Sequence, residues 1–180
     1  MIEKTFMAGF GGQGIISMGQ AWIYAAMKEG LEVTFFPFYG AEKRGGVARA
    51  SVIVSDSQIS SPLVTKAHSV VVMSADSLAI GEAVAAPNSL LLVNSDLVKA
   101  ESARKDLRVL RVPCNSLAEE IGDVKIANMV MMGALAEATG ALKLATIEKV
   151  FESFFPPSKR SFIPMNLKAI EAGRKAVREA

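Results

Sequence analysis

Four glycines occur within six residues at positions 9–14, between an apolar run at 5–8 and a helix-like run that begins at Ile15. Because glycine has no Cβ, such a stretch allows positive φ angles and a close approach of the main chain to a ligand. Where a turn leads into a helix, the first N–H groups have no partner within the helix, and the helix dipole adds partial positive charge. The stretch therefore predicts a strand–turn–helix unit with an anion site, most often for phosphate. A tight turn that binds nothing is the alternative.

The spacing Gly9-x-Gly11-x-x-Gly14 also matches the dinucleotide-binding fingerprint, with a strand before it and a helix after it. A nicotinamide-binding unit further needs an acidic residue about 20 positions later, at the end of the next strand, to hold the ribose hydroxyls. The next predicted strand, at 33–37, ends without a carboxylate, and Glu32 precedes it. We therefore interpret the stretch as a phosphate-binding loop and keep an NAD-like or flavin-like cofactor as an alternative.

A second glycine-rich segment follows this strand at 38–46 and carries two adjacent cations, Lys43 and Arg44, next to Gly45 and Gly46. Arginine offers phosphate a bidentate fork, and lysine offers a point charge. In a βαβ unit, this segment lies at the carboxyl end of the second strand, beside the first glycine turn. We therefore expect two anion-binding loops at one edge of the sheet. Taken alone, the second segment also fits a solvated loop.

A chain of 180 residues with a formal net charge of +2 fits one domain, 1–180, and favours neither nucleic-acid nor membrane binding. Its single cysteine excludes a disulfide within the chain and a cysteine-ligated iron–sulfur cluster, which needs about four thiolates, so a reducing cytoplasm is the expected location. Apolar residues make up 51% without the 14 glycines, which is above the roughly 45–50% of soluble domains counted with glycine. Because no run reaches the about 18 apolar residues of a membrane helix, we expect this excess to be buried against another protein.

Apolar runs bounded by turn residues predict a single three-layer α/β domain with a mixed, mainly parallel sheet. A short return at residues 58–59, after the strand at 47–54, predicts an antiparallel hairpin, and this hairpin makes the sheet mixed. The other predicted strands lie at 5–8, 33–37, 69–73, 89–93 and 107–112.

The predicted helix at 15–29 has one narrow polar stripe, and its other residues are largely apolar. Gly19 in its middle indicates close packing against a neighbouring backbone, and Gly30 is expected to end it as a left-handed cap. The stripe consists of Ser17, Gln20, Tyr24 and Lys28.

The run at 126–136 is apolar almost all round and too short to span a bilayer, so it predicts a central core helix or an interface helix. Asn128 within it needs a hydrogen-bond partner from the backbone or from a ligand, and the backbone is the simpler source. Ser116 and Glu119 match a capping box, which predicts a helix that follows Ser116. Further helices are expected after Ser74, at 145–154 and from Pro164 onward.

Side chains suited to catalysis are few. His68 is the only histidine, and because no spacing supports a triad around it, we interpret it as a partly buried structural residue. Cys114 lies where a strand turns into a helix, a position that can lower a thiol pKa, but without a nearby base we interpret it as inert. The chain also lacks metal-ligand spacing of histidines, cysteines or paired carboxylates. We therefore predict a binding subunit without catalytic or metal-binding residues.

Taken together and in order, three stretches resemble the gamma subunit of 2-oxoacid:ferredoxin oxidoreductases. They are GFGGQGI at 9–15, YGAEKRGG at 39–46 and NMVMMGAL at 128–135. The strand end Val54-Ser55-Asp56 and the residues Ile59-Ser60-Ser61-Pro62 that follow it are similar to the same family. The resemblance extends over nearly the whole chain and is closest to the 2-oxoglutarate and branched-chain 2-oxoacid types. The chain departs from the family pattern at Ala41 and Lys43, between its Tyr-Gly and Arg-Gly-Gly.

The resemblance implies an enzyme that oxidatively decarboxylates a 2-oxoacid of the 2-oxoglutarate or 2-oxoisovalerate class, forms an acyl-CoA and reduces ferredoxin. In this family, thiamine diphosphate and the iron–sulfur clusters belong to partner chains, namely alpha, beta and ferredoxin-like subunits. The isolated gamma subunit is then expected to be inactive. A stand-alone nucleotide-binding module and a purely structural subunit remain the alternatives.

The resemblance also associates the gamma subunit with coenzyme A, whose pyrophosphate and 3′-phosphate suit two anion-binding glycine loops. By this match, the expected contacts to coenzyme A are Gly11, Gly12, Gln13, Gly14, Lys43, Arg44, Gly45 and Gly46.

Overall fold

The computed structural model describes residues 1–39 and 46–179. Its strands are β1 (Ile2–Phe10), β2 (Glu32–Tyr39), β3 (Val47–Ser55), β4 (Ala67–Val72), β5 (Ala85–Asn94) and β6 (Arg108–Val112). They form one six-stranded sheet in the order β2-β3-β1-β4-β5-β6. Strand β3 is antiparallel to both β1 and β2, whereas the pairs β1–β4, β4–β5 and β5–β6 are parallel. The predicted mixed, mainly parallel sheet is confirmed.

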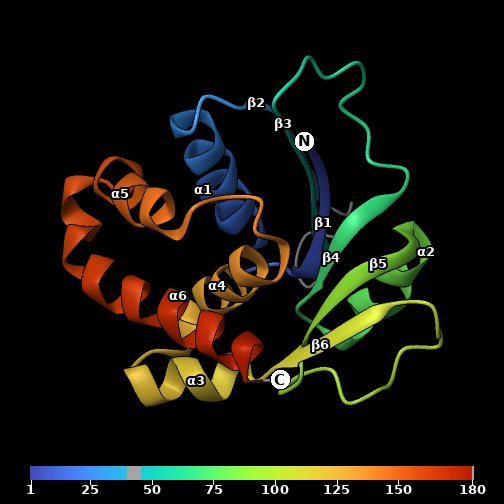
Figure 1. Cartoon of the computed structure of the whole chain (residues 1–180). Helices are drawn as coiled ribbons and strands as arrows, with labels where there is room; N and C mark the ends of the chain where they lie inside the picture. The colour runs from blue at the N-terminus through green and yellow to red at the C-terminus, as the bar shows by residue number, and fades with distance from the viewer. Residues whose placement is uncertain (40–45, 180) are drawn as a thin grey trace.

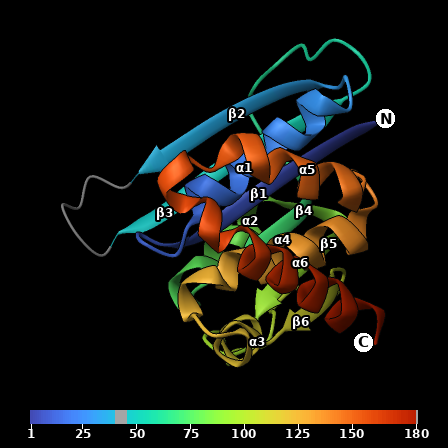
Figure 2. The ribbon, with the colours of Figure 1, turned by 90° about the vertical axis from the view of Figure 1, so that its left-hand side faces the viewer.

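Helices cover the two faces of the sheet unequally (Figure 1). The α-helices are α1 (Ile15–Lys28), α2 (Leu78–Val84), α3 (Cys114–Ile121), α4 (Ala127–Thr139), α5 (Leu144–Phe154) and α6 (Ile163–Arg178), and the 3-10 helices are η1 (Ala75–Ser77), η2 (Val124–Ile126) and η3 (Pro157–Phe162). Figure 2 shows α1, α3, α4, α5 and α6 on one face, while α2 lies on the other. The domain therefore has three layers, of which the layer around α2 is thin. Within the described ranges, no helix is both long and apolar enough to span a membrane.

The antiparallel part of the sheet differs from the prediction. The crossover from β1 through α1 to β2 leaves room for one strand, and β3 fills it, so that Ala50 lies opposite Met7 on one side and Pro37 on the other. The predicted hairpin at residues 58–59 is wrong, because β3 already has a partner on both sides and residues 58–59 join no strand. Since β3 is antiparallel to both neighbours, the carboxyl ends of β1 and β2 lie at the same edge of the sheet.

Helix α1 places its polar stripe as predicted, with Ser17, Gln20, Tyr24 and Lys28 all exposed. The prediction of a narrow stripe is incomplete, because Met27 is also exposed. Gly30 has φ 76° and confirms the left-handed end of the helix. The prediction that Gly19 packs against a neighbouring backbone is wrong. A Cβ at this position would lie 2.7 Å from the ring of Phe35, so the glycine makes room for an aromatic side chain of β2.

Helix α4 is the core of the helical layer, because every residue from Ala127 to Ala136 is buried. Its main neighbour is α6, and the two helices meet at Gly133 and Gly173. A Cβ on Gly133 would lie 2.7 Å from the carbonyl carbon of Ile170, and a Cβ on Gly173 would lie equally close to that of Val130. The two backbones are therefore in direct contact, and only glycine fits at both positions.

The start of α3 corrects another prediction. The helix begins at Cys114, two residues before the Ser116 that was expected to cap it. Ser116 instead donates from its backbone N–H and its Oγ to the two carboxylate oxygens of Asp96, at 2.8 and 2.9 Å. A carboxylate 20 residues away in sequence thus satisfies the first turn of this helix.

Candidate functional site

The glycine turn joins the carboxyl end of β1 to the amino end of α1, and two of its glycines adopt the left-handed conformation. Gly12 has φ 98° and Gly14 has φ 75°. The second glycine-rich segment meets this turn at its described end, because the Gly11 N–H donates to the carbonyl of Gly46 at 3.1 Å. The expected contacts Lys43, Arg44 and Gly45 lie outside the described residues. At the level of Gly46, the two glycine segments lie side by side at one edge of the sheet.

Gln13 holds the turn closed through its side chain. Its Oε1 accepts from the N–H of Phe10 at 2.7 Å, and its Nε2 donates to the carbonyl of Met73 at 3.1 Å, just beyond β4. The amide therefore links the ends of β1 and β4 beneath the turn. The role that the structure assigns to Gln13 is to shape the turn, and a contact between this side chain and a ligand stays a prediction.

The backbone at the start of α1 offers several hydrogen-bond donors. Met18 makes the first helical bond, from its N–H to the carbonyl of Gly14 at 2.8 Å. The N–H groups of Ile15, Ile16 and Ser17 precede this bond and have no acceptor within residues 1–39 and 46–179. The first turn of α1 contains no acidic residue. These donors, together with the helix dipole, form the anion-attracting end that the sequence predicts.

Asn128 fixes the position of this turn from the core. It is 6% exposed, and its Nδ2 donates to the Gly14 carbonyl at 3.3 Å, so the backbone partner predicted for it is confirmed. The fit is close, because a Cβ on Gly14 would lie 2.9 Å from the Cγ of Asn128. The buried helix α4 therefore supports the glycine turn directly.

Two hollows border the turn. One of about 710 Å³ extends from Gly14 along the polar stripe of α1 and is walled by α5, η3 and α6; a smaller one of about 210 Å³ lies beside Gly12 and Gln13. Lys125 lines both hollows, and Lys159 lines the larger one. Sequence reasoning missed both lysines, because only the fold brings η2 and η3 to the start of α1. The position of Lys125 shortly before the apolar run of α4 is the one sequence signal that points to it.

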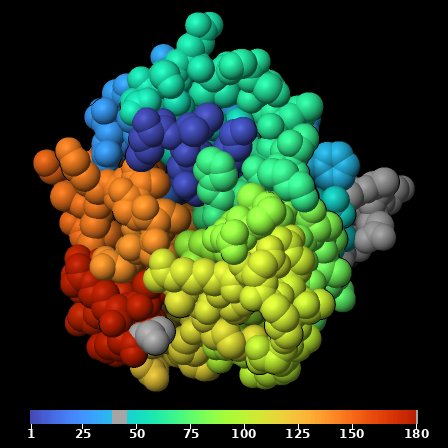
Figure 3. Space-filling view, turned by 45° about the vertical axis from the view of Figure 1, so that its right-hand side comes forward, coloured from blue at the N-terminus to red at the C-terminus, as the bar shows by residue number. Residues whose placement is uncertain are grey.

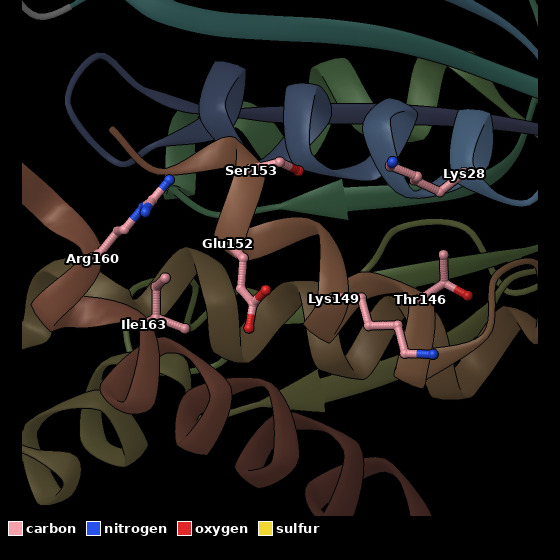
Figure 4. A pocket seen from close by; sticks show the side chains of 7 residues that line it. All are labelled: Lys28, Thr146, Lys149, Glu152, Ser153, Arg160 and Ile163. Carbon is pink, nitrogen blue, oxygen red and sulfur yellow. The ribbon is translucent and has the colours of Figure 1, made fainter. Parts of the chain in front are cut away.

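A hollow of about 870 Å³ lies between α1, α5 and η3 and reaches the carboxyl end of α1 at Lys28. Figure 4 shows Lys28 from α1, Lys149 from α5 and Arg160 from η3 around it, together with Glu152. The dipole of α1 is unfavourable for an anion there, because the carboxyl end of a helix carries partial negative charge. We therefore place the candidate site at the glycine turn, although the hollow beside it is smaller.

The candidate catalytic side chains lie apart from this site. Burial raises the pKa of the Cys114 thiol, with the Asp96 carboxylate as a second cause, so this cysteine stays protonated. His68 is exposed on β4, with its Nδ1 3.8 Å from Oε2 of Glu3, and the expectation of a partly buried histidine is wrong. Within the described ranges, no three histidine, cysteine or carboxylate side chains converge on a possible metal site.

The fold and this site define a class: an α/β domain with a glycine turn between its first strand and its first helix. Residues 4–176 match the family model for pyruvate ferredoxin/flavodoxin oxidoreductase. The chain is 34% identical to the 2-oxoglutarate synthase subunit KorC of Methanothermobacter marburgensis, over 99% of this chain and 98% of that protein. It is also 34% identical to the ketoisovalerate oxidoreductase subunit VorA of Methanothermobacter thermautotrophicus, over 98% of this chain and 36% of that protein.

Solved structures agree with this match. The keto/oxoacid ferredoxin oxidoreductase gamma subunit of Geobacter sulfurreducens superposes with a TM-score of 0.86 at 27% identity, over 99% of each chain. The fold also recurs, with a TM-score of 0.90 at 23% identity, in 31% of a chain of 2-oxoglutarate:ferredoxin oxidoreductase from Magnetococcus marinus, a structure that contains 2-oxoglutarate, coenzyme A and succinyl-CoA. The chain belongs to the pyruvate ferredoxin/flavodoxin oxidoreductase family. The resemblance noted from the three sequence motifs is thereby confirmed.

Proposed function

We propose that this chain is the gamma-type subunit of a multi-subunit 2-oxoacid:ferredoxin oxidoreductase. The parent enzyme oxidatively decarboxylates a 2-oxoacid of the 2-oxoglutarate or 2-oxoisovalerate class to an acyl-CoA and passes the electrons to ferredoxin. The observation that carries this proposal is the match to KorC over nearly the full length of both chains. The cytoplasm is the proposed location, since ferredoxin-linked enzymes need a reducing compartment.

The contribution of this subunit is to help bind coenzyme A at the glycine turn. Coenzyme A carries a pyrophosphate and a 3′-phosphate, which need several donors and positive charge. The amino end of α1 supplies N–H groups that have no acceptor among the described residues, and Lys125 lies beside the same turn. The larger hollow, which extends from Gly14 past Tyr24, has room for an extended ligand. The proposed contacts from the two glycine segments are Gly11, Gly12, Gln13, Gly14, Lys43, Arg44, Gly45 and Gly46.

The redox chemistry belongs to partner subunits in this proposal. Thiamine diphosphate and the iron–sulfur clusters are assigned to alpha, beta and ferredoxin-like subunits, because the single cysteine of this chain is buried and protonated. The purified chain should therefore fail to reduce a dye with 2-oxoglutarate and coenzyme A, and activity should return only with the partner subunits. Turnover by the isolated chain would contradict this division of roles.

The variant Arg44→Ala in the assembled enzyme tests the coenzyme A site. Loss of one charge-assisted hydrogen bond, worth about 1.5–3 kcal/mol, should raise the KM for coenzyme A about tenfold or more. The KM for the 2-oxoacid should stay nearly constant. Lys149→Ala is the matched control, because it removes a cation from the hollow that reaches the carboxyl end of α1. Equal effects of Arg44→Ala on both substrates, or no effect, would exclude Arg44 as a ligand contact.

Calorimetry on the isolated chain separates this proposal from a nucleotide-binding module. Titration with coenzyme A, NADH and FAD should give heat only with coenzyme A, if the site is complete in one subunit. Binding of NADH or FAD in preference to coenzyme A would favour the module. Absence of binding by all three, together with an unchanged KM in the Arg44→Ala enzyme, would favour a purely structural subunit.

A further inference from the structure

The face of the sheet opposite α1 carries an apolar pocket around a single arginine, far in the fold from the polar stripe of α1. The pocket has a volume of about 280 Å³. Two cross-strand pairs line it: Phe36 lies opposite Ser51, and Phe38 lies opposite Arg49. Leu63, from the segment between β3 and β4, closes one side. Figure 3 shows this segment in teal at the top of the surface.

Arg49 at the centre of the pocket lacks an acceptor among the described residues. Its Nε is buried and makes no hydrogen bond, and no carboxylate of residues 1–39 or 46–179 forms an ion pair with its guanidinium group. The guanidinium carbon lies 5.7 Å from the ring centroid of Phe38, which holds the charge over an aromatic face. A buried guanidinium donor without a partner is costly, and a carboxylate is the acceptor that matches its planar fork.

The rim of the pocket is apolar and exposed. Phe36 is 48% exposed, Phe38 is 51% exposed and Leu63 is 57% exposed. Because β2 is an edge strand, whose described neighbour is β3 alone, this rim continues to the open edge of the sheet. Large exposed aromatic side chains around a charged centre resemble the core of a protein interface, in which aromatic and arginine residues are enriched. The pocket is smaller than the roughly 300–1,000 Å³ of small-molecule sites, so it fits a side chain better than a cofactor.

We propose that this surface, defined by Phe36, Phe38, Arg49 and Leu63 and here called the Arg49 face, docks a neighbouring subunit of the same oxidoreductase. The neighbour places an aspartate or glutamate carboxylate on Arg49 and apolar side chains against the three rim residues. Because Arg49 is positively charged, the group of the neighbour that complements it is acidic. The matched domain makes up 36% of VorA, so a related enzyme joins this type of domain to further protein. The inference rests on the proposed subunit role and is independent of the coenzyme A site.

The test uses the assembled enzyme and three variants of this chain. Arg49→Met keeps the apolar stem and removes the charge, so the dissociation constant of the chain from the remaining subunits should rise at least about tenfold. Arg49→Lys keeps the charge without the fork and should give an intermediate rise. Lys149→Met, on the helical side, is the control and should leave the constant within about twofold. The urea midpoint of each isolated variant shows whether it remains folded.

Two further measurements decide which group Arg49 meets. Glu42→Gln, in the segment outside the described residues, should leave assembly unchanged; if it reproduces the Arg49→Met defect, the acceptor lies in the same chain and the proposal is wrong. A photo-crosslinking residue at Phe36 should join this chain to a subunit that carries thiamine diphosphate or an iron–sulfur cluster. Crosslinks only between two copies of this chain, or assembly that Arg49→Met leaves intact, would overturn the docking proposal. Wild-type chain that never assembles with such subunits would overturn the proposed function itself.

Discussion

Replacing Gly14 with alanine tests the geometry of the glycine turn, because two separate penalties coincide at this residue. Gly14 has φ 75°, and the left-handed conformation costs a residue with a Cβ about 1–2 kcal/mol. The new Cβ would also lie 2.9 Å from the Cγ of Asn128, which is buried in α4 and cannot swing into solvent. Either Asn128 or the turn must therefore move.

Gly30 is a matched control for the conformational penalty. Its φ is 76°, and among the described residues no atom lies within 4 Å of the position of its Cβ. A less flexible unfolded chain offsets part of the cost in both variants by about 0.4–1 kcal/mol, so Gly30→Ala should cost about 1 kcal/mol. Gly14→Ala adds overpacking of about 1–3 kcal/mol and weakens a hydrogen bond worth about 1 kcal/mol, for a total of about 3–5 kcal/mol. This is a large share of the about 5–15 kcal/mol that stabilises a typical domain.

Urea unfolding measures this difference through the fluorescence of Trp22, which is the only tryptophan and is fully buried. Asn128→Ala should act as a partial suppressor, because the Cβ of residue 128 would then lie at an ordinary 3.4 Å from the Cβ of residue 14. We expect a coupling free energy of about 2 kcal/mol between Gly14→Ala and Asn128→Ala. If Gly14→Ala is as stable as Gly30→Ala, or if the two substitutions are additive, the contact between the turn and α4 does not have the described geometry.

Three other expectations concern the core and the ionisable groups. Gly173→Ala should lower the free energy of unfolding by about 2 kcal/mol. The clash of the new Cβ with the Val130 backbone outweighs a gain of about 1 kcal/mol in helix propensity. A urea titration in which the variant is more stable than wild type would contradict the α4–α6 contact. Burial raises the pKa of Cys114, so a thiol reagent should label the native chain only as fast as it unfolds, and labelling at the rate of a free cysteine would count against this. Desolvation raises the pKa of Glu3 above 4.5, so its stabilising contribution is complete below pH 4.5 and is lost as pH rises through the folded pKa. The advantage of Glu3→Gln over wild type should therefore grow above pH 4.5, and unfolding curves that stay parallel across pH would refute this.

Much of the local structure could be predicted because it depends on neighbouring residues in the chain. Glycine content indicated the turn at 9–14, helical periodicity indicated the exposed stripe of α1, and the unbroken apolar run indicated that α4 is buried. Gly30 was identified as a helix end for the same local reason, since only its conformation matters and no distant residue touches it. The family could also be predicted, because the three motifs occur together and in the order that is typical of it.

Contacts between distant segments account for what the sequence left open. The insertion of β3 between β1 and β2 depends on backbone pairing along both of its edges, which no short-range pattern specifies. Ser116 resembled a cap, but α3 begins earlier, and Asp96 from another loop accepts from the N–H and the Oγ of Ser116.

The glycine spacing alone predicted the tight turn between the first strand and the first helix. The apolar composition led us to expect burial against another protein, and the glycine content led us to expect anion binding at the turn; both stay predictions. Only the tertiary structure decided that Lys125 lies beside that turn, that Gln13 is engaged in shaping it, and that Arg49 lies beside exposed phenylalanines without an acceptor in the described part of the chain. The physical reason is the range of the interactions. Backbone conformation and periodicity are set within a few residues, whereas the burial of a charge or an amide depends on which distant strands and helices close around it.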